Sequence, residues 1–300
     1  MLCGWHTRSE IRLTGVPISL NKRGGNLDVA IQFAVGQCPM PDSTGRSVFQ
    51  HTREGSFIRI ADVADFEIME GRQIRIWPAG GATQKDIEIF LLGPAWATLC
   101  HQRGTLPLHA SAIVTGTGVT AFAGHSGAGK STTAALMNSL GYAVIADDIL
   151  PVSLNENLIP GAWPYLRRLK LHRDPITELA FTAIEAVSET RDKDKYFVYP
   201  KQAAEDKWRK LERLYLIENE TADFQESIQQ ITGSEAVRVL LDNTYHFNFI
   251  RETRGFGDHL TLCSRLSSNI RIYRLRRSPL SGKGKGFGSL ICEHLESAGR

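Results

Sequence analysis

Near the middle of the chain stands the stretch Ala121-Phe-Ala-Gly124-His-Ser-Gly-Ala-Gly129-Lys130-Ser131-Thr132. It matches the pattern G-x-x-x-x-G-K-[ST] at every fixed position, from Gly124 to Ser131. An apolar run over 119–123 leads in and predicts a buried strand, and good helix formers over 132–140 lead out. Strand, glycine loop and helix in this order are typical of a P-loop, whereas a chance match in a glycine-rich turn would not require these neighbours.

The residue types in this loop suit a nucleoside triphosphate. Glycines let backbone N–H groups curl around phosphate oxygens, and the following helix N-terminus adds partial positive charge. Lys130 is expected to reach the β- and γ-phosphates, and the hydroxyl of Ser131 to bind Mg²⁺. We assign no separate chemistry to His125, whose position in the motif tolerates many residues. The residues expected to contact the nucleotide are Gly124, His125, Ser126, Gly127, Ala128, Gly129, Lys130, Ser131 and Thr132.

Two adjacent acids, Asp147 and Asp148, end the next apolar run, 141–146. Functional groups of α/β proteins gather at the carboxyl ends of strands, and Mg²⁺ prefers oxygen ligands. One acid can hold the metal while the other accepts the proton of an attacking hydroxyl or water. The alternative is a solvated turn before the next strand, and the P-loop favours the site.

His109 lies at the end of the strand predicted before the P-loop strand, where it could face the phosphates or simply pack. The basic run Arg167, Arg168 and Lys170 alternates with leucines. It is interpreted as a solvated strand face, with a basic edge that contacts a phosphate or an acidic peptide as the alternative.

Composition places few further limits on function. A chain of 300 residues with 42% hydrophobic and 22% charged residues is typical of a folded protein, and a net charge of +3 does not by itself indicate a nucleic-acid partner. The five cysteines are scattered without metal-site spacing, and no apolar run is long enough to span a membrane. Because the first residues also lack the pattern of a signal peptide, we expect a cytoplasmic protein.

Apolar periodicity and turn residues predict an α/β fold with a smaller β-rich N-terminal domain. The expected divisions are a β-rich domain over 1–84, a P-loop domain over 85–277 that begins with a bridging helix over 85–104, and a flexible tail over 278–300. The predicted strands cover 11–18, 30–35, 65–69, 72–77, 106–114, 119–123, 141–146, 149–154, 166–171, 196–199, 211–218, 224–231 and 270–275. Among them, 65–69 and 72–77 are expected to form a hairpin with its turn at Glu70-Gly71, and 211–218 and 224–231 to pair through a turn at 219–222. The predicted helices cover 85–102, with a kink at Gly93-Pro94, and 132–140, 175–188, 234–245 and 256–268.

The combination of these motifs resembles the catalytic domain of HPr kinase/phosphorylase. The shared pattern is a strand with His109, then Gly-His-Ser-Gly-Ala-Gly-Lys-Ser-Thr, then Ile-Ala-Asp147-Asp148. More closely, the chain resembles HPr-kinase-related serine kinases of bacteria, some of which are encoded with lasso-peptide biosynthesis enzymes. The resemblance covers about residues 85–277 and implies a P-loop fold related to phosphoenolpyruvate carboxykinase. By match, Asp147 corresponds to the catalytic base, Asp148 to a metal-associated carboxylate and His109 to a histidine close to the reacting phosphate.

The resemblance implies an ATP- and Mg²⁺-dependent kinase that acts on a serine of a peptide or protein. The sequence lacks the downstream E-x-R-G and P-G-R-N-like segments of the bifunctional enzymes, which puts the phosphorylase activity and HPr as the substrate in doubt. That leaves another peptide or protein as the acceptor, and the resemblance to the lasso-associated kinases makes a lasso-type precursor peptide the specific acceptor expected. We expect neither a nucleic acid nor a membrane partner. An HPr-type protein kinase, a small-molecule kinase and a nucleotide-sensing binding protein remain alternatives. The oligomeric state stays open, a homo-oligomer included.

Overall fold

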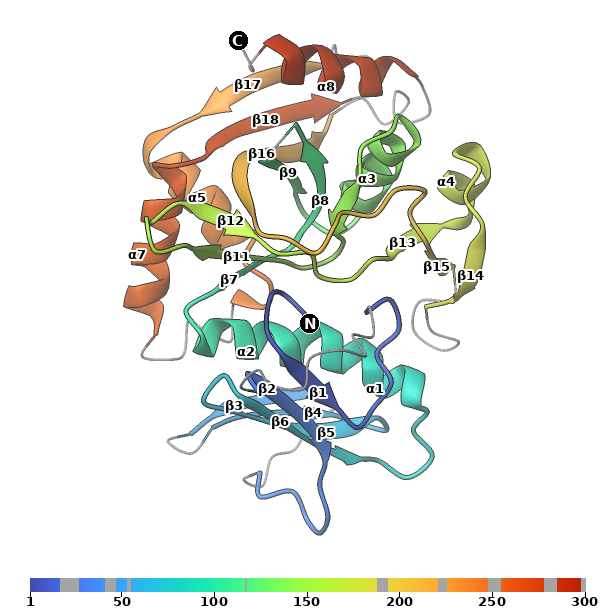
Figure 1. The fold of residues 1–300 in the computed structure, drawn as a ribbon, viewed down its shortest axis with the longest axis vertical. Helices are drawn as coiled ribbons and strands as arrows, with labels where there is room; N and C mark the ends of the chain where they lie inside the picture. The colour runs from blue at the N-terminus through green and yellow to red at the C-terminus, as the bar shows by residue number, and fades with distance from the viewer. Residues whose placement is uncertain are drawn as a thin grey trace.

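The computed structural model describes residues 1–16, 27–40, 47–52, 55–116, 118–187, 194–220, 226–247, 255–277 and 285–297. Within these residues the chain is a mixed α/β protein whose strands form sheets of six, nine and three strands, and this confirms the predicted class. Figure 1 shows the six-stranded sheet at one end of the molecule, two helices across its middle and the large sheet beyond them.

The N-terminal sheet is built around a hairpin. Phe66 pairs with Ile76, and Ile68 pairs with Ile74, so alternate apolar side chains share the buried face. The turn has Glu70 at φ 52° and Gly71 at φ 63°, as a tight hairpin turn requires, and this confirms the predicted hairpin. In spatial order the strands are β1 (Thr7–Ser9), β2 (Val29–Phe33), β6 (Gln73–Pro78), β5 (Ala64–Met69), β4 (Ser56–Ile60) and β3 (Ser47–His51).

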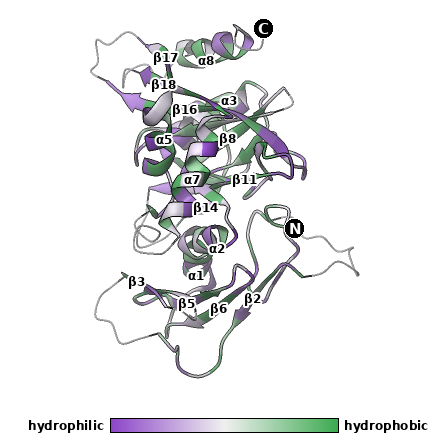
Figure 2. Cartoon of the chain, turned by 90° about the vertical axis from the view of Figure 1, so that its left-hand side faces the viewer, coloured by the Kyte–Doolittle hydropathy of each residue, from purple (hydrophilic) through white to green (hydrophobic). Residues whose placement is uncertain are grey.

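A kinked helical segment connects this sheet to the rest of the chain. It comprises α1 (Gln84–Phe90), the π-helical turn η1 (Leu91–Ala95) and α2 (Trp96–Gln102). Gly93 has the non-helical angles φ −101° and ψ −107° just before Pro94, which confirms the predicted kink. Figure 2 shows α1 and α2 between the six-stranded sheet and the remaining elements.

One continuous buried core runs from the six-stranded sheet through these helices into the large sheet. Trp96 of α2 is fully buried within it and stacks on Tyr165. A buried ion pair adds a polar link, because Arg168 donates to Glu88 over 2.9 Å and Glu88 also accepts from the backbone and hydroxyl of Thr14. The two parts of the chain that the sequence divides at residue 84 are therefore packed together through the shared apolar core and through the hydrogen bonds from Thr14 to Glu88.

The large sheet brings several strand ends to one edge. β8 pairs antiparallel with both β10 and β9, and β16 runs parallel to β9 and β18. The carboxyl ends of β9, β10, β16 and β18 therefore lie on the same side as the start of β8. The strands of this large sheet are β7 (Leu106–Leu108), β8 (Ala110–Thr115), β9 (Gly118–Ala123), β10 (Val144–Ala146), β11 (Leu150–Leu154), β12 (Pro160–Ala162), β16 (Arg209–Asn219), β17 (Ser227–Ile231) and β18 (Arg271–Arg277).

The remaining elements cover or extend this sheet. Helix α3 packs its buried Ala134 and Met137 into a second core with Phe122 and Tyr215. A small sheet has the order β13 (Leu169–His172), β15 (Lys195–Val198) and β14 (Ala183–Ala186). The helices are α3 (Lys130–Ser139), α4 (Arg173–Glu178), α5 (Gly233–Asp242), α7 (Phe256–Ser267) and α8 (Lys285–Ser297).

Three predicted features of the fold differ from the structure because pairing partners lie far away in sequence. The single strand predicted over 106–114 is divided into β7 and β8, which pair with different neighbours on the two sides of His109. The helix predicted over 175–188 ends at Glu178, and residues after it pair with β15. The strands predicted over 211–218 and 224–231 exist but do not pair with each other, because β18 lies between them.

The two ends of the chain also differ from prediction. Residues 11–16 form no strand, because β1 precedes them and takes the place beside β2. The predicted tail is a packed helix over 285–297, where Phe287 and Ile291 are buried against the second core. The predicted disorder over 278–284 lies outside the described residues.

Candidate functional site

The glycine loop, residues 124–129, joins β9 to α3 at the edge where the strand ends meet. Gly124 has φ 142°, and a Cβ there would lie 2.8 Å from the backbone oxygen of Ile217, so the packing of β16 leaves room for no side chain. Gly129 has φ 97° and immediately precedes Lys130, the first residue of α3. Strand, loop and helix are thus arranged as the motif predicts.

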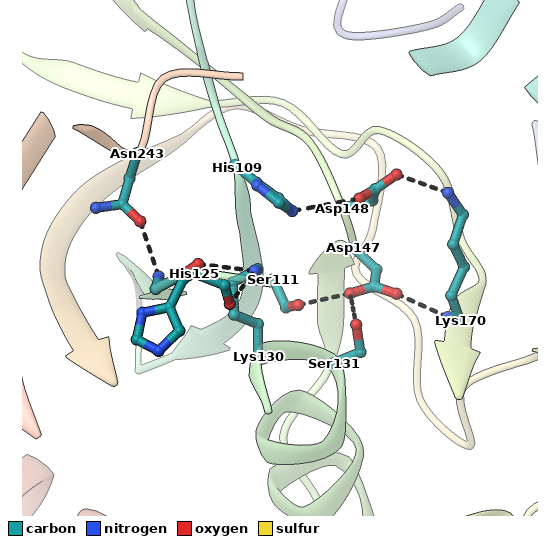
Figure 3. A network of polar contacts seen from close by, with 10 residues as sticks. His109, Ser111, His125, Lys130, Ser131, Asp147, Asp148, Lys170 and Asn243 are labelled. Carbon is teal, nitrogen blue, oxygen red and sulfur yellow. Dashed lines mark hydrogen bonds and ion pairs between the residues drawn. The ribbon is translucent and has the colours of Figure 1, made fainter. Parts of the chain in front are cut away.

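Lys130 lies under the loop with its ammonium group inside the loop's curve. Its Nζ donates to the carbonyl oxygens of Gly124 (2.8 Å) and His125 (3.2 Å), as Figure 3 shows. Only 8% of the residue is exposed, and burial lowers its pKa, an effect that Asp148 and Asp147 oppose. The loop therefore holds a positive charge where an anion at its mouth would meet it.

Asp147 joins three separate elements through its carboxylate. Its Oδ1 accepts from the hydroxyls of Ser111 on β8 (2.5 Å) and Ser131 on α3 (2.8 Å), and its Oδ2 accepts from the backbone N–H of Lys170 on β13 (2.7 Å). The residue is 2% exposed. Burial raises its pKa, while the hydrogen bonds from Ser111 and Lys170 act in the opposite direction.

Asp148 faces other partners than its neighbour does. Its φ of 71° lies in the left-handed region, which turns the chain between the two carboxylates. Oδ2 accepts from Nζ of Lys170 (2.6 Å), and Oδ1 lies 3.6 Å from Nε2 of His109. Burial acts most strongly and raises the pKa of Asp148, but the charge and hydrogen bond of Lys170, with His109 and Lys130, together outweigh it, and the pKa falls to about 2. The carboxylate is therefore ionised at neutral pH.

His109 stands at the junction of β7 and β8, between the loop and Asp148 (Figure 3). Its ring packs edge-on against Tyr245, with 5.5 Å between the ring centres. Burial and the charge of Lys130 lower its pKa to about 4, so the imidazole is neutral at physiological pH.

Asn243, the C-cap residue of α5, binds both the loop and His109. Its Oδ1 accepts from the N–H of Gly124 (2.8 Å), and its backbone oxygen accepts from the N–H of His109 (2.7 Å). The side-chain amide also donates to the carbonyl of Val239 over 2.8 Å, so the Asn243 side chain is held in one orientation. This residue positions the first glycine of the loop from a helix more than a hundred residues away in sequence.

The structure brings together most of the residues that the motifs single out. Lys130, Ser131, Asp147, Asp148 and His109 lie at one sheet edge. The resemblance implies that Ser131 and Asp148 share Mg²⁺, whereas in the structure the Ser131 hydroxyl donates to Asp147.

Four residues of this neighbourhood escaped sequence reasoning, among them Ser111, whose hydroxyl donates to Asp147 from β8. The predicted solvated face of the basic strand is wrong for Lys170, which binds both carboxylates, and for Arg168, which is 4% exposed. In the basic strand, the alternation of charged residues with leucines indicated a strand but gave no sign of the contacts of Lys170 and Arg168. Asn243 follows an ordinary amphipathic helix, and no local pattern distinguishes it.

The donor set at the loop suits a hard cation. Ser131 and Asp147 present oxygen atoms 2.8 Å apart at the start of α3, and such ligands fit Mg²⁺, which also takes waters and substrate phosphate oxygens. No group of three or more His, Cys, Asp or Glu side chains arranged for a metal occurs in the described ranges. Ser131 and Asp147 would supply two of the oxygen ligands that such a cation takes.

Comparisons with known proteins add little to this geometry. No family model matches the chain, and no curated protein matches it. Among solved structures, the chain is similar to the Hpr(Ser) kinase/phosphatase from Coxiella burnetii at 10% identity and a TM-score of 0.32, over 65% of this chain and 99% of that one. A TM-score of this size establishes neither a shared fold nor a shared activity.

Of the helices in the described parts of the chain, none is both long and apolar enough to cross a membrane.

Proposed function

We propose that the protein is a kinase that transfers the γ-phosphoryl group of ATP to a serine hydroxyl of a peptide or protein. The observation that carries this proposal is the meeting of Lys130, Ser131 and two differently bonded carboxylates at one sheet edge. A loop that only bound a nucleotide would need no second carboxylate paired with Lys170 and His109. The acceptor class follows from the resemblance of these motifs to the HPr-kinase-related serine kinases, and a lasso-type precursor peptide is the specific acceptor proposed.

The bonding of the two acids supports a division of labour opposite to the one that the resemblance implies. Asp147 is buried and both of its oxygens are engaged, so we assign it to Ser131 and the cation. Asp148 is more accessible, with 26% of its side chain exposed, and lies beside neutral His109. We therefore assign to Asp148 the proton of the attacking hydroxyl.

In this mechanism the serine oxygen forms a bond to the γ-phosphorus as its proton passes to Asp148, and ADP leaves with the electron pair of the broken P–O bond. Lys130 stabilises negative charge on the transferring group, and the loop N–H groups act in the same way. Mg²⁺, when bound, neutralises charge on the β- and γ-phosphates. A loose transition state needs little basicity, so a carboxylate with a pKa of about 2 suffices to receive the proton late in the transfer.

Transfer of label from ATP tests the function directly. The full chain is incubated with Mg²⁺ and γ-labelled ATP, together with an array of serine peptides, a lasso-type precursor peptide and an HPr-type protein. We expect label on serine, strongest on the precursor peptide, and none on matched peptides with alanine in place of serine. Nucleotide binding without a labelled product would support the nucleotide-sensing alternative and contradict the kinase.

The contact of Asn243 with the loop leads to a second prediction. Asn243→Ala leaves the buried N–H of Gly124 without its acceptor, which is expected to lower the free energy of unfolding by about 1–3 kcal/mol and transfer by about tenfold. Chemical denaturation and initial rates measure the two effects.

Asn269 offers a matched control for this substitution. It follows α7, and its amide likewise donates to the carbonyl four residues before it, at Arg265, but it lies outside the loop contacts described above. We expect Asn269→Ala to leave transfer unchanged. Equal losses from the two substitutions would show that Asn243 acts only as a helix cap.

A further inference from the structure

Two adjoining hollows connect the carboxylates with the region between α1 and the small sheet, which lie next to each other in Figure 1. The first hollow borders Asp147, Asp148 and Lys170 and has a volume of about 10 Å³, which is room for about one water molecule. The second, of about 180 Å³, borders Lys85 on α1 and Glu185 on β14. The residues common to both linings are Ile89, Arg168 and Phe197. A group that fills the first hollow is therefore adjacent to whatever fills the second.

The sizes of the two hollows suit parts of a peptide. The second is smaller than the range of about 300–1,000 Å³ that is usual for small-molecule sites, so it suits a single side chain better than a nucleotide or coenzyme. The first has room for one hydroxyl group, such as that of the serine which the proposed mechanism brings to Asp148. Together the hollows match a serine hydroxyl and a side chain close to it.

Arg168 presents a buried donor to both hollows. Only 4% of its side chain is exposed, its Nη1 donates to Glu88 over 2.9 Å, and its Cζ lies 3.9 Å from the ring centre of Phe197. Its Nε is buried and has no hydrogen-bond acceptor among the residues that the structure describes. A buried donor without an acceptor is destabilising, so an oxygen atom of a ligand at this place would be bound favourably.

The charges around the second hollow are already paired. Glu88 accepts from Arg168 and from the backbone and hydroxyl of Thr14, and Nζ of Lys85 lies 3.3 Å from Oε2 of Glu185. A charged ligand would unbalance these pairs, whereas a neutral one would not. Because the Thr14 hydroxyl donates to Glu88, its oxygen can accept from a ligand. A carboxamide, which carries both a carbonyl oxygen and an NH₂ group, matches the donor of Arg168 and the acceptor of Thr14.

The strand that follows Arg168 sets the distance between the two hollows. Arg168 and Lys170 both border the first hollow, while Leu169 between them is buried in the second core, so the two basic side chains share one face. Two residues of a strand span about 6.5 Å, and an extended peptide has the same repeat. A serine at Asp148, the partner of Lys170, therefore places the residue two positions away beside Arg168.

We propose that the second hollow is an acceptor subsite, which takes an asparagine or glutamine side chain two residues from the serine. The carbonyl oxygen of this side chain accepts from Nε of Arg168, and its NH₂ group donates to the hydroxyl of Thr14. The inference rests on the proposed kinase function and names the acceptor sequence that the kinase selects. It gives α1 and the segment with Thr14 a part in that selection.

The test uses a short Gly/Ala host peptide with one serine, and with glutamine, glutamate, leucine or alanine two positions before or two positions after the serine. Transfer of label from ATP gives kcat/KM for each peptide, and calorimetric titration gives its affinity. We expect glutamine to exceed alanine by about tenfold at one of the two positions, the scale of one hydrogen bond to a charged group. Glutamate and leucine are expected to give no such gain.

Two substitutions connect this preference to the hollow. Arg168→Lys keeps a positive charge for Glu88 but removes the donor at Nε, and Glu185→Trp fills the hollow from a partly exposed position. Each is expected to abolish the preference for glutamine, and Glu185→Trp decides the matter if the buried Arg168→Lys substitution prevents folding. Ile184→Trp is the matched control, because Ile184 is the exposed neighbour of Glu185 on β14 and does not line the hollow. It should leave the preference unchanged.

Several results would overturn the inference. A preference for glutamate would show that the ion pair of Lys85 and Glu185 opens for an acidic side chain, and a preference for leucine would show an apolar site. Equal kcat/KM for all peptides would exclude the subsite, as would a glutamine preference that Glu185→Trp leaves intact. Binding that keeps the glutamine preference while no peptide is labelled would support the subsite and contradict the proposed kinase. Binding of none of the peptides would contradict both.

Discussion

Lys130→Ala is expected to lower phosphoryl transfer by at least ~10²-fold, the scale of losing one electrostatic contributor to a transition state. The ammonium group is held inside the loop by two backbone carbonyls, so no neighbouring cation can take its place without rebuilding the loop. Initial rates at saturating ATP and peptide measure the effect.

The control must separate lost charge from lost packing, because Lys130 is buried. Lys201→Ala is the control for the loss of a positive charge as such. The Nζ of Lys201 donates to the carbonyl of Leu179, away from the loop, so we expect normal transfer by this variant. Circular dichroism and thermal unfolding of Lys130→Ala check that the fold persists. A folded Lys130→Ala protein with near-normal rates would remove the loop from the mechanism.

The second large effect concerns the two carboxylates. Asp147→Asn is expected to lower transfer by at least ~10²-fold and to raise the Mg²⁺ concentration required for half-maximal rate. If the asparagine oxygen keeps the bonds from Ser111 and Ser131, its amide nitrogen faces the backbone N–H of Lys170, and two donors then oppose each other. The site loses a negative charge and the orientation of its ligand together.

Asp148→Asn is expected to reduce kcat on a similar scale of ~10²-fold while the Mg²⁺ requirement stays unchanged, because this carboxylate handles the proton. Rates measured across a Mg²⁺ titration distinguish the two variants. The opposite pattern, in which the Asp148 variant requires more Mg²⁺ and the Asp147 variant does not, would restore the roles that the family resemblance implies. Near-normal phosphoryl transfer by both folded variants would show that neither carboxylate takes part in the reaction.

Elements with a complete local signal were predicted well. The hairpin over 64–78 has alternating apolar residues on both strands and a turn whose residues tolerate positive φ, so its register needed no distant partner. The kink at Gly93 follows from the missing N–H of Pro94. Elements whose form depends on remote pairing were predicted less well, as the division of 106–114 on the two sides of His109 shows.

The residues of the site also fall into those that local sequence identifies and those that only the tertiary structure identifies. Gly124, Lys130 and Ser131 belong to one continuous motif whose spacing encodes both its backbone and its chemistry, and Asp147-Asp148 is recognisable as a strand end, so all of these could be found from neighbouring residues alone. The residues that contact them could not be found in this way. The sheet order places β8 between β10 and β9, and this brings Ser111 and His109 to the carboxylates.

Local sequence was therefore sufficient for the strand, the glycine loop, the helix and the presence of two acids, because backbone preference and short-range spacing act within a few residues. The three-dimensional arrangement was needed to show that Ser131 bonds to Asp147 rather than Asp148, that Lys170 links both acids, and that Asn243 holds the loop. These contacts depend on strand order and register across the sheet, which arise from the packing of the whole chain and leave no mark in the spacing of any one segment.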